Sequence, residues 1–118
     1  MEKTKKTAEN KIENEKTNQF ELVLTVVNRG FSGEVMEAAI KKGATGGTML
    51  NARGTYKQVQ TVLGMKIEPE KEVVLIVVNK QITKEIITAI YEHCGLTTQG
   101  SGICFALPVS QVAGLRYN

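Results

Sequence analysis

The feature that most constrains this fold is an order of local patterns that occurs twice. In each half of the chain, a strand-like segment precedes an amphipathic segment with helical spacing, and a second strand-like segment follows. The residues expected to begin the two helices, Ser32 and Thr83, lie 51 positions apart, and the glycines expected to end them, Gly43 and Gly95, lie 52 positions apart. The sequence therefore predicts two β-α-β units in tandem.

Four segments are expected to form strands. Residues 20–28 alternate between apolar and polar at first and end apolar, and a short strand is expected at 48–52. Residues 73–78 are an uninterrupted run of Val, Leu and Ile, which predicts a central strand buried on both faces. The last strand is expected at 103–107, where Pro108 ends it.

The ends of the two helices are marked by local signals. Ser32 and Thr83 are predicted to be N-caps, because a hydroxyl can accept a hydrogen bond from the first turn, and Gly43 and Gly95 can adopt the left-handed conformation that ends a helix. With right-handed crossovers, the fold class is α+β, a ferredoxin-like βαββαβ sandwich in which two helices cover one face of a four-stranded antiparallel sheet. The other face of this sheet is expected to be apolar and to have no helices over it, which favours an oligomer that buries this surface.

The composition argues against several function classes. The longest apolar run, residues 73–78, is too short to cross a bilayer, and no signal-peptide pattern begins the chain, so a cytoplasmic location is expected. A net charge of +3, with scattered basic residues, argues against a nucleic-acid partner. Asp is absent, His93 is the one histidine, and Cys94 and Cys104 form no CxxC motif. Neither a metal site nor acid–base catalysis is therefore expected.

Two segments stand outside the repeated pattern. Residues 1–18 are rich in Lys and Glu and contain three apolar residues, which predicts a flexible charged tail before a domain at 19–118. The connection at 55–70 is long for a link between the two middle strands and has no clear periodicity, which is typical of a functional loop. Its apolar residues would also suit a simple extension of the hairpin.

The order of several short motifs resembles that of the PII signalling family. Residues 43–48 (GATGGT) and 52–54 (ARG) are similar to the turn that opens the second PII strand and to the glycine that ends it. Residues 74–78 resemble the third strand, and residues 100–102 (GSG) resemble the B-loop Gly-Asp-Gly. The resemblance covers roughly residues 20–116.

PII proteins are homotrimers that bind adenine nucleotides in clefts between subunits, where a T-loop changes shape with the ligand and docks on a target. The resemblance implies a nitrogen-regulatory type of signalling protein, not an enzyme, with an adenine nucleotide as ligand and a protein target such as a membrane transporter. Glycine turns let backbone N–H groups approach phosphates, and Thr, Lys and Arg side chains add hydroxyls and charge. The implied nucleotide-binding residues are Thr45, Gly46, Gly47, Thr48, Gly54, Lys57, Lys71, Gly100, Ser101, Gly102 and Arg116. The implied partner-binding residues of the loop are Tyr56, Gln58, Gln60, Leu63 and Met65.

The sequence departs from the PII pattern at the phosphate site. Ile103 follows Gly102 where the family has a phosphate-binding Lys, Ser101 replaces an Asp, and Gly114 stands where one of two Arg residues is expected. The T-loop is about six residues shorter than usual. Losing one charge-assisted phosphate contact costs about 1.5–3 kcal/mol, or ten- to a hundredfold in affinity. ADP, AMP or a cyclic nucleotide is therefore predicted in preference to ATP.

Two other functional hypotheses are compatible with the same fold. One is a small enzyme, for which the candidate groups are His93, Cys94, Cys104 and Tyr56. Because His93 and Cys94 are adjacent on a predicted helix, their side chains do not face each other. The other is a ligand-free trimeric scaffold, resembling the trimers of the metal-tolerance type, which would show no response to nucleotides.

Overall fold

A computed structural model of the chain describes residues 19–55, 61–66, 68–97 and 102–115. Its main sheet has the strand order β2-β5-β1-β6, with every neighbouring pair antiparallel. The strands are β1 (Phe20–Asn28), β2 (Thr48–Arg53), β5 (Glu70–Asn79) and β6 (Ile103–Val109). The predicted βαββαβ ferredoxin-like sandwich is confirmed, and the tail predicted for residues 1–18 lies outside the described residues.

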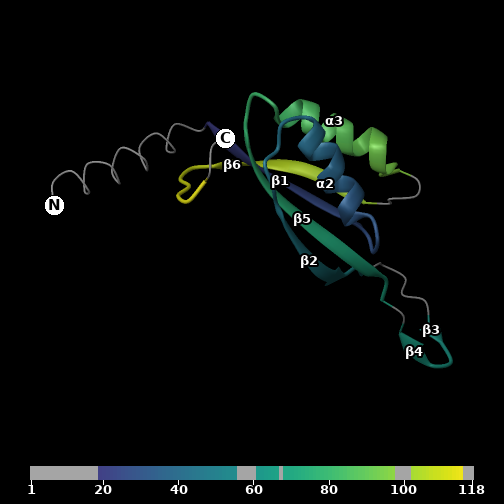
Figure 1. The fold of residues 1–118 in the computed structure, drawn as a ribbon. Helices are drawn as coiled ribbons and strands as arrows, with labels where there is room; N and C mark the ends of the chain where they lie inside the picture. The colour runs from purple at the N-terminus through teal and green to yellow at the C-terminus, as the bar shows by residue number, and fades with distance from the viewer. Residues whose placement is uncertain (1–18, 56–60, 67, 98–101, 116–118) are drawn as a thin grey trace.

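The two helices pack side by side on one face of this sheet (Figure 1). Helix α2 (Ser32–Lys41) buries Val35, Ala38 and Ala39, and helix α3 (Thr83–Cys94) buries Ile86, Ile90 and Cys94. These side chains meet the alternate residues of the two central strands, which are Val23, Val27, Val74, Ile76 and Val78. Among the described residues, no helix is both long and apolar enough to cross a bilayer.

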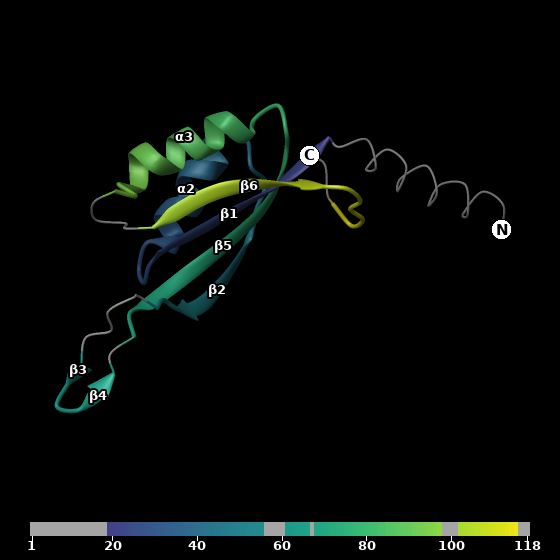
Figure 2. The same ribbon diagram turned by 180° about the vertical axis from the view of Figure 1, so that it is seen from behind.

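The opposite face of the sheet carries a second apolar surface, which we call the open face. Strand partners share a face, so the pairing places its side chains in three rows across the sheet. The rows are Leu50, Val73, Val26 and Ile103; Leu75, Leu24 and Phe105; and Val77, Leu22 and Leu107. Neither helix lies over this face, as the view from behind also shows (Figure 2). At its β6 edge, Ile103 is 56% exposed and Leu107 is 44% exposed.

The predicted burial of residues 73–78 on both faces is wrong for the single chain. Val74, Ile76 and Val78 are buried beneath the helices, whereas Val73 and Val77 on the open face are only half-buried. The run is continuous in sequence because both faces of this central strand are apolar, but the helices that the structure describes cover only one of them. The predicted end of the last strand is also wrong: Pro108 lies inside β6, which is an edge strand and so tolerates a residue without an N–H group.

The predicted N-caps are wrong as well. The helices begin at Ser32 and Thr83 themselves, the cap positions are Phe31 and Ile82, and neither cap makes a side-chain hydrogen bond. At α2, the carboxylate of Glu72 on the neighbouring strand accepts the backbone N–H of Ser32 at 3.2 Å. The predicted glycine end of α3 is confirmed, since Gly95 is left-handed with φ 59° and ψ 56°.

The connection between β2 and β5 contains a small second sheet. Strands β3 (Thr61–Val62) and β4 (Met65–Lys66) pair as an antiparallel hairpin that projects beyond the end of the main sheet (Figure 1). Its two turn residues, Leu63 and Gly64, both have positive φ, as a tight two-residue hairpin requires. This hairpin is a sheet of its own and does not continue the β2–β5 ladder, which ends at Arg53 and Glu70.

The close contact at Gly102 gives a test of the strand placement. An ideal Cβ at Gly102 would lie 1.7 Å from the carbonyl oxygen of Val26. We expect Gly102→Ala to force β1 and β6 apart and to lower the free energy of unfolding by about 2 kcal/mol or more. Chemical denaturation of the purified variant measures this.

Gly33→Ala is the matched control. A Cβ at Gly33 meets nothing within 4 Å, and this residue lies in α2. Alanine is favoured over glycine in a helix by roughly 0.5–1 kcal/mol, so this variant should be slightly more stable than the wild type. Equal stability of the two alanine variants would contradict the placement of β6 against β1.

Candidate functional site

The candidate site begins where the loop leaves the sheet. The last pair of the β2–β5 ladder is Arg53 with Glu70, and beyond it the N–H of Gly54 donates to the carbonyl oxygen of Pro69 at 2.9 Å. The two ends of the loop are therefore held together at its stem. A small residue is needed at Gly54, because an ideal Cβ there would lie 3.2 Å from Cε of Lys71.

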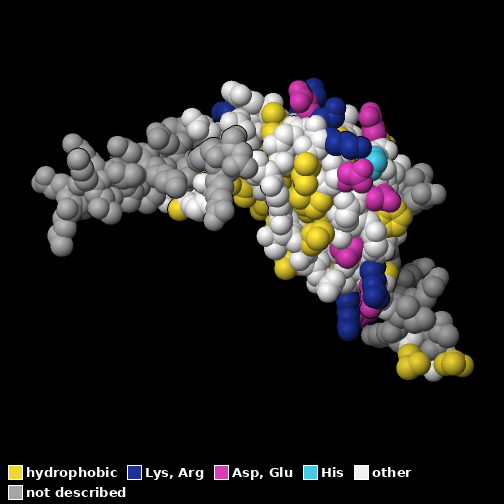
Figure 3. Space-filling model, viewed as in Figure 1, with side chains coloured by type: hydrophobic (Ala, Val, Ile, Leu, Met, Phe, Trp, Pro, Cys, Tyr) yellow, Lys and Arg dark blue, Asp and Glu magenta, His cyan; other side chains and the backbone are white. Residues whose placement is uncertain are grey.

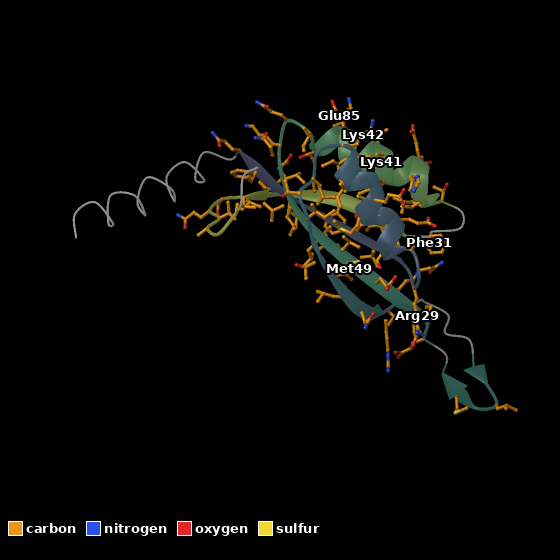
Figure 4. The ribbon with its side chains drawn as sticks, viewed as in Figure 1. Arg29, Phe31, Lys41, Lys42, Met49 and Glu85 are labelled. Carbon is orange, nitrogen blue, oxygen red and sulfur yellow. The ribbon has the colours of Figure 1, made fainter. Side chains whose placement is uncertain are left out.

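A polar pocket of about 310 Å³ opens beside this stem, and we call it the stem pocket. Its lining residues are Arg29, Asn51, Ala52, Arg53, Glu70 and Lys71. Three of these side chains are cationic and one is anionic, so the pocket carries a net positive charge. Arg29 lies at the end of the sheet from which the loop departs (Figure 4).

Lys71 is the predicted phosphate ligand whose setting is best defined. Its side chain crosses Gly54, only 8% of the residue is exposed, and its ammonium nitrogen Nζ donates to Oδ1 of Asn28 at 2.6 Å. Asn28 is also the residue directly opposite Lys71 in the β1–β5 ladder. Sequence reasoning missed Asn28, although the pairing of the two strands would have revealed it.

The neighbouring carboxylates are engaged by other groups. Glu70 forms an ion pair with Arg29, and Glu72 accepts hydrogen bonds from the backbone N–H groups of Gly30, at 2.7 Å, and Ser32, at 3.2 Å. Burial alone would raise the pKa of the Glu72 carboxyl. The hydrogen bonds and the charge of Arg29 together outweigh this effect, so the pKa lies below its ordinary value. Glu72 therefore fixes the β1–α2 turn as an ionised carboxylate.

The second group of predicted site residues lies elsewhere, in the turn before β2. Thr45, Gly46 and Thr48 are exposed, and a Cβ at Gly46 would meet open space. Gly47 is different, because an ideal Cβ there would lie 2.9 Å from both the carbonyl oxygen of Leu75 and Sδ of Met36. The turn is thus packed tightly on one side and accessible on the other.

Gly102 lies at the opposite edge of the sheet, just before β6. Its N–H donates to the carbonyl oxygen of Leu96 at 3.0 Å. Since β2 and β6 are the two edge strands, they lie three strand spacings, or about 14 Å, apart across the sheet. The structure therefore places Gly54 beside Lys71, and it places the turn before β2 and Gly102 at opposite edges of the sheet. Several predicted residues lie outside the described part of the chain: Tyr56, Lys57, Gln58, Gln60, Gly100, Ser101 and Arg116.

The two described residues of the predicted partner-binding set form the tip of the hairpin. Leu63 is 92% exposed and Met65 is 66% exposed, and hydrophobic side chains mark this tip in the space-filling view (Figure 3). Leu63 has φ 54°, a backbone conformation that glycine or asparagine adopts more readily than leucine. The loop thus presents an apolar residue at a position where a polar one would be less strained.

The cysteines considered as candidate nucleophiles face the core, Cys94 from the end of α3 and Cys104 from β6. Burial, with smaller contributions from Glu34 and Cys104, raises the pKa of the Cys94 thiol to about 11. Burial also raises the pKa of Cys104, and a hydrogen bond from Thr25 partly offsets this effect. Both thiols are free, and an elevated pKa disfavours the reactive thiolate.

Comparison with known proteins identifies relatives of this architecture. The family model described as Nitrogen regulatory protein P-II matches residues 20–118. The crystal structure of Arabidopsis thaliana PII bound to citrate is 29% identical, has a TM-score of 0.62, and the match covers 78% of each chain. The B. subtilis GlnK–ATP complex is 20% identical, has a TM-score of 0.62, and the match covers 79% of this chain and 84% of that one. The search of curated proteins finds no match.

The lowered pKa of Glu72 predicts a pH dependence of stability. A carboxyl whose pKa is lower in the folded state stabilises the fold above its unfolded pKa, near 4.5, and loses this contribution as the pH falls through its folded pKa. We expect Glu72→Gln to be less stable than the wild type at pH 7, with the difference shrinking below pH 4.5. Denaturation across this range measures it.

Glu92→Gln, which removes the same charge from an exposed position of α3 outside its first turn, is the control. If Glu72→Gln and Glu92→Gln destabilise the protein equally at pH 7, the assigned hydrogen bonds of Glu72 contribute nothing specific.

Proposed function

This chain belongs to the Nitrogen regulatory protein P-II family, and we propose that it is a regulator that binds an adenine nucleotide between the subunits of a homotrimer. The observation that carries this proposal is the position of the turn before β2 and of Gly102, the residue before β6. They lie at opposite edges of a sheet whose open face is apolar. If copies of the chain cover one another's open faces, the β2 edge of one copy meets the β6 edge of the next.

The trimer is proposed to form through the open face. Its rows of Leu, Val, Ile and Phe form an extended apolar surface, larger than scattered hydrophobic residues on a monomer would produce. In a closed ring of three copies, the open face of every copy would be buried. Each cleft would then place Thr45, Gly46, Gly47 and Thr48 of one copy near Gly100, Ser101, Gly102 and Arg116 of another. Gly54, Lys57 and Lys71 would contribute from the stem of the loop.

We propose ADP, AMP or a cyclic nucleotide as the preferred ligand over ATP. The side chain that follows Gly102 is Ile103, which lies on the open face and carries no charge to offer a third phosphate. The related proteins are described as bound to citrate and to ATP, so anionic ligands are compatible with this fold. The positive charge of the stem pocket suits a phosphate or carboxylate group in the same way.

The loop at 55–70 is proposed to pass the binding signal to a protein target. Its stem lies against Lys71, so a ligand at the stem pocket can favour one loop arrangement over another, which is what regulation requires. Leu63 and Met65 at the tip, together with Tyr56, Gln58 and Gln60, would contact the target. By analogy with the family, we propose that the target is a membrane transporter and that the protein acts in nitrogen regulation.

We propose a regulator and not an enzyme, acting in the cytoplasm. The family is regulatory, the elevated thiol pKa of Cys94 disfavours nucleophilic catalysis, and two free thiols suit a reducing compartment. Residues 1–18 are proposed to be a charged tail outside the folded domain at 19–118. The ligand-free scaffold remains the alternative, and it would form the same trimer without any nucleotide response.

Substitution on the open face tests the trimer. Leu24 lies in the middle row, between Leu75 and Phe105. We expect Leu24→Asp to convert a species of three-chain mass into single chains, because three carboxylates would be buried at the interface. Light scattering measures the mass, and Leu63→Asp, at an exposed position away from this face, should leave it unchanged. A three-chain mass for Leu24→Asp would contradict the proposed interface.

Calorimetric titration tests the ligand preference. We expect ADP or AMP to bind the wild type at least as tightly as ATP, and Ile103→Lys to raise the affinity for ATP about ten- to a hundredfold. Ile103→Gln, of similar length but uncharged, should not raise it. If the wild type binds no adenine nucleotide, the scaffold alternative replaces this proposal. If the wild type already prefers ATP by a hundredfold or more, the proposed preference for ADP or AMP is wrong, but the proposed nucleotide-binding regulator is not contradicted.

A further inference from the structure

A second pocket lies between the two helices, on the side of the molecule away from the open face. We call it the helix groove, and its volume is about 560 Å³. Ala38 of α2 and Ala89 of α3 both line it, and because these side chains are small, the two helices leave a hollow between them. The helix groove would stay accessible in the proposed trimer, since that trimer buries the opposite face of the sheet.

One end of the helix groove is basic. The end of α2 lies beside the start of α3, because an ideal Cβ at Gly43 would lie 3.2 Å from Cδ1 of Ile82. Figure 4 shows the charged side chains of this end over the helices, away from Phe31. Those that line the groove are three cations and one anion, namely Lys41, Lys42, Lys84 and Glu85.

The other end of the helix groove is acidic. Glu92 and His93, near the end of α3, line the groove there. Glu34 in the first turn of α2 lies close by: burial is the main cause of the raised pKa of the Cys94 thiol, and the charge of Glu34 adds to it. The charge along the groove therefore changes from positive to negative.

The segment that precedes β1 enters at the basic end. The N–H of Lys80 donates to the carbonyl oxygen of Gln19 at 2.7 Å, and α3 begins three residues after Lys80, at Thr83. The 18 residues before Gln19 can span up to about 60 Å, whereas the 12 residues of α3 are about 18 Å long. This segment is therefore long enough to follow the groove from end to end.

The order of charges in residues 1–18 is complementary to that of the groove. Residues 9–18, which are nearest to the domain, contain three Glu and two Lys, whereas residues 1–8 contain three Lys and one Glu. A segment that enters at the basic end thus brings its acidic half to the lysines and its basic half to Glu92. Ile12, between the two halves, is an apolar side chain that suits the floor formed by Ala38 and Ala89.

From this match we infer that residues 1–18 bind along the helix groove of their own chain, with the acidic half beside Lys42 and Lys84 and the basic half beside Glu92. The tail stays outside the core of the domain and covers its outer surface. Single contacts between exposed charges are weak, but the covalent link holds the tail at a local concentration in roughly the millimolar range. The contact therefore opens readily and weakens as the ionic strength rises.

Hydrogen exchange of backbone amides in the full-length protein tests this inference. We expect residues 9–16 to exchange about tenfold more slowly than in a synthetic peptide of the same sequence. Lys42→Glu combined with Lys84→Glu should raise the rate to that of the peptide, and so should Glu13→Lys combined with Glu15→Lys. All four substitutions together should restore slow exchange, because opposite charges then face each other again.

The variants are chosen so that the domain still folds. Lys42 and Lys84 are exposed, and the two substitutions in the tail lie before the domain. Lys41 is left unchanged because it pairs with Glu37 at 3.4 Å. Arg53→Glu is the control, since it reverses an exposed cation at the loop end of the sheet and should leave exchange of the tail unchanged.

Ionic strength gives a second measurement on the wild type. In 1 M salt the screening length falls to about 3 Å, so exchange of residues 9–16 should approach the rate of the peptide.

Three results would overturn the inference. Exchange of the wild-type tail at the rate of the peptide in low salt would leave the groove to a second copy or to another protein. Slow exchange that survives reversal of Lys42 and Lys84 would place the tail on another surface. Rapid exchange in the variant with all four substitutions would show that the two sets of charges do not meet. None of these results bears on nucleotide binding, so the proposed function is tested separately.

Discussion

The sheet has two apolar faces, and the two helices among the described residues cover only one of them. Both helices lie on the same side, where the buried valines and isoleucines of β1 and β5 form the core. The rows of the open face, from Leu50 to Ile103 and from Val77 to Leu107, are covered by neither helix. Apolar surface on this scale favours association, and the position of β2 and β6 at the two edges decides which segments would meet when copies associate. The proposed location of the ligand site therefore follows from the way the sheet is covered.

Electrostatic contacts at one end of the sheet define the part of the site that a single chain can supply. Glu72 holds the β1–α2 turn, Arg29 pairs with Glu70, and Asn28 holds Lys71 beneath the loop stem. All three contacts join the end of β1 to the start of β5, which are neighbours in the sheet but distant in sequence. The loop thus emerges from a rigid base, while its tip presents Leu63 in a left-handed conformation that is unfavourable for leucine. This division into a fixed base and an exposed apolar tip suits a segment that reports on a ligand.

Local patterns in the sequence predict the elements well but not the contacts between them. The bounds of β1 and the left-handed end of α3 at Gly95 follow from alternation and from glycine chemistry, and both are confirmed. The N-cap prediction for Ser32 is wrong because the helix begins one residue earlier than expected, at Ser32 itself. The N–H of Ser32 is bound instead by Glu72, forty residues away, which no local pattern reveals. The prediction that Pro108 ends the last strand is wrong because an edge strand tolerates proline, and which strand lies at the edge depends on the sheet order. Asn28 could not be found from the sequence because its contact with Lys71 also depends on which strands are neighbours. Lys71 itself was predicted only through the resemblance.

The central claim, that each ligand site is shared between two copies, can be tested most directly with mixed oligomers. Gly46→Glu would place a carboxylate in the turn before β2, where a side chain meets open space. Ser101→Glu would add a carboxylate at the position that directly precedes Gly102 in the sequence. Each variant alone should fail to bind ADP. When the two are co-expressed in equal amounts, random assembly of a closed ring should restore binding at about one quarter of the sites, because some interfaces then combine an intact β2 edge with an intact β6 edge. No recovery of ADP binding in mixed oligomers of confirmed composition would place the whole site within one chain and contradict the account.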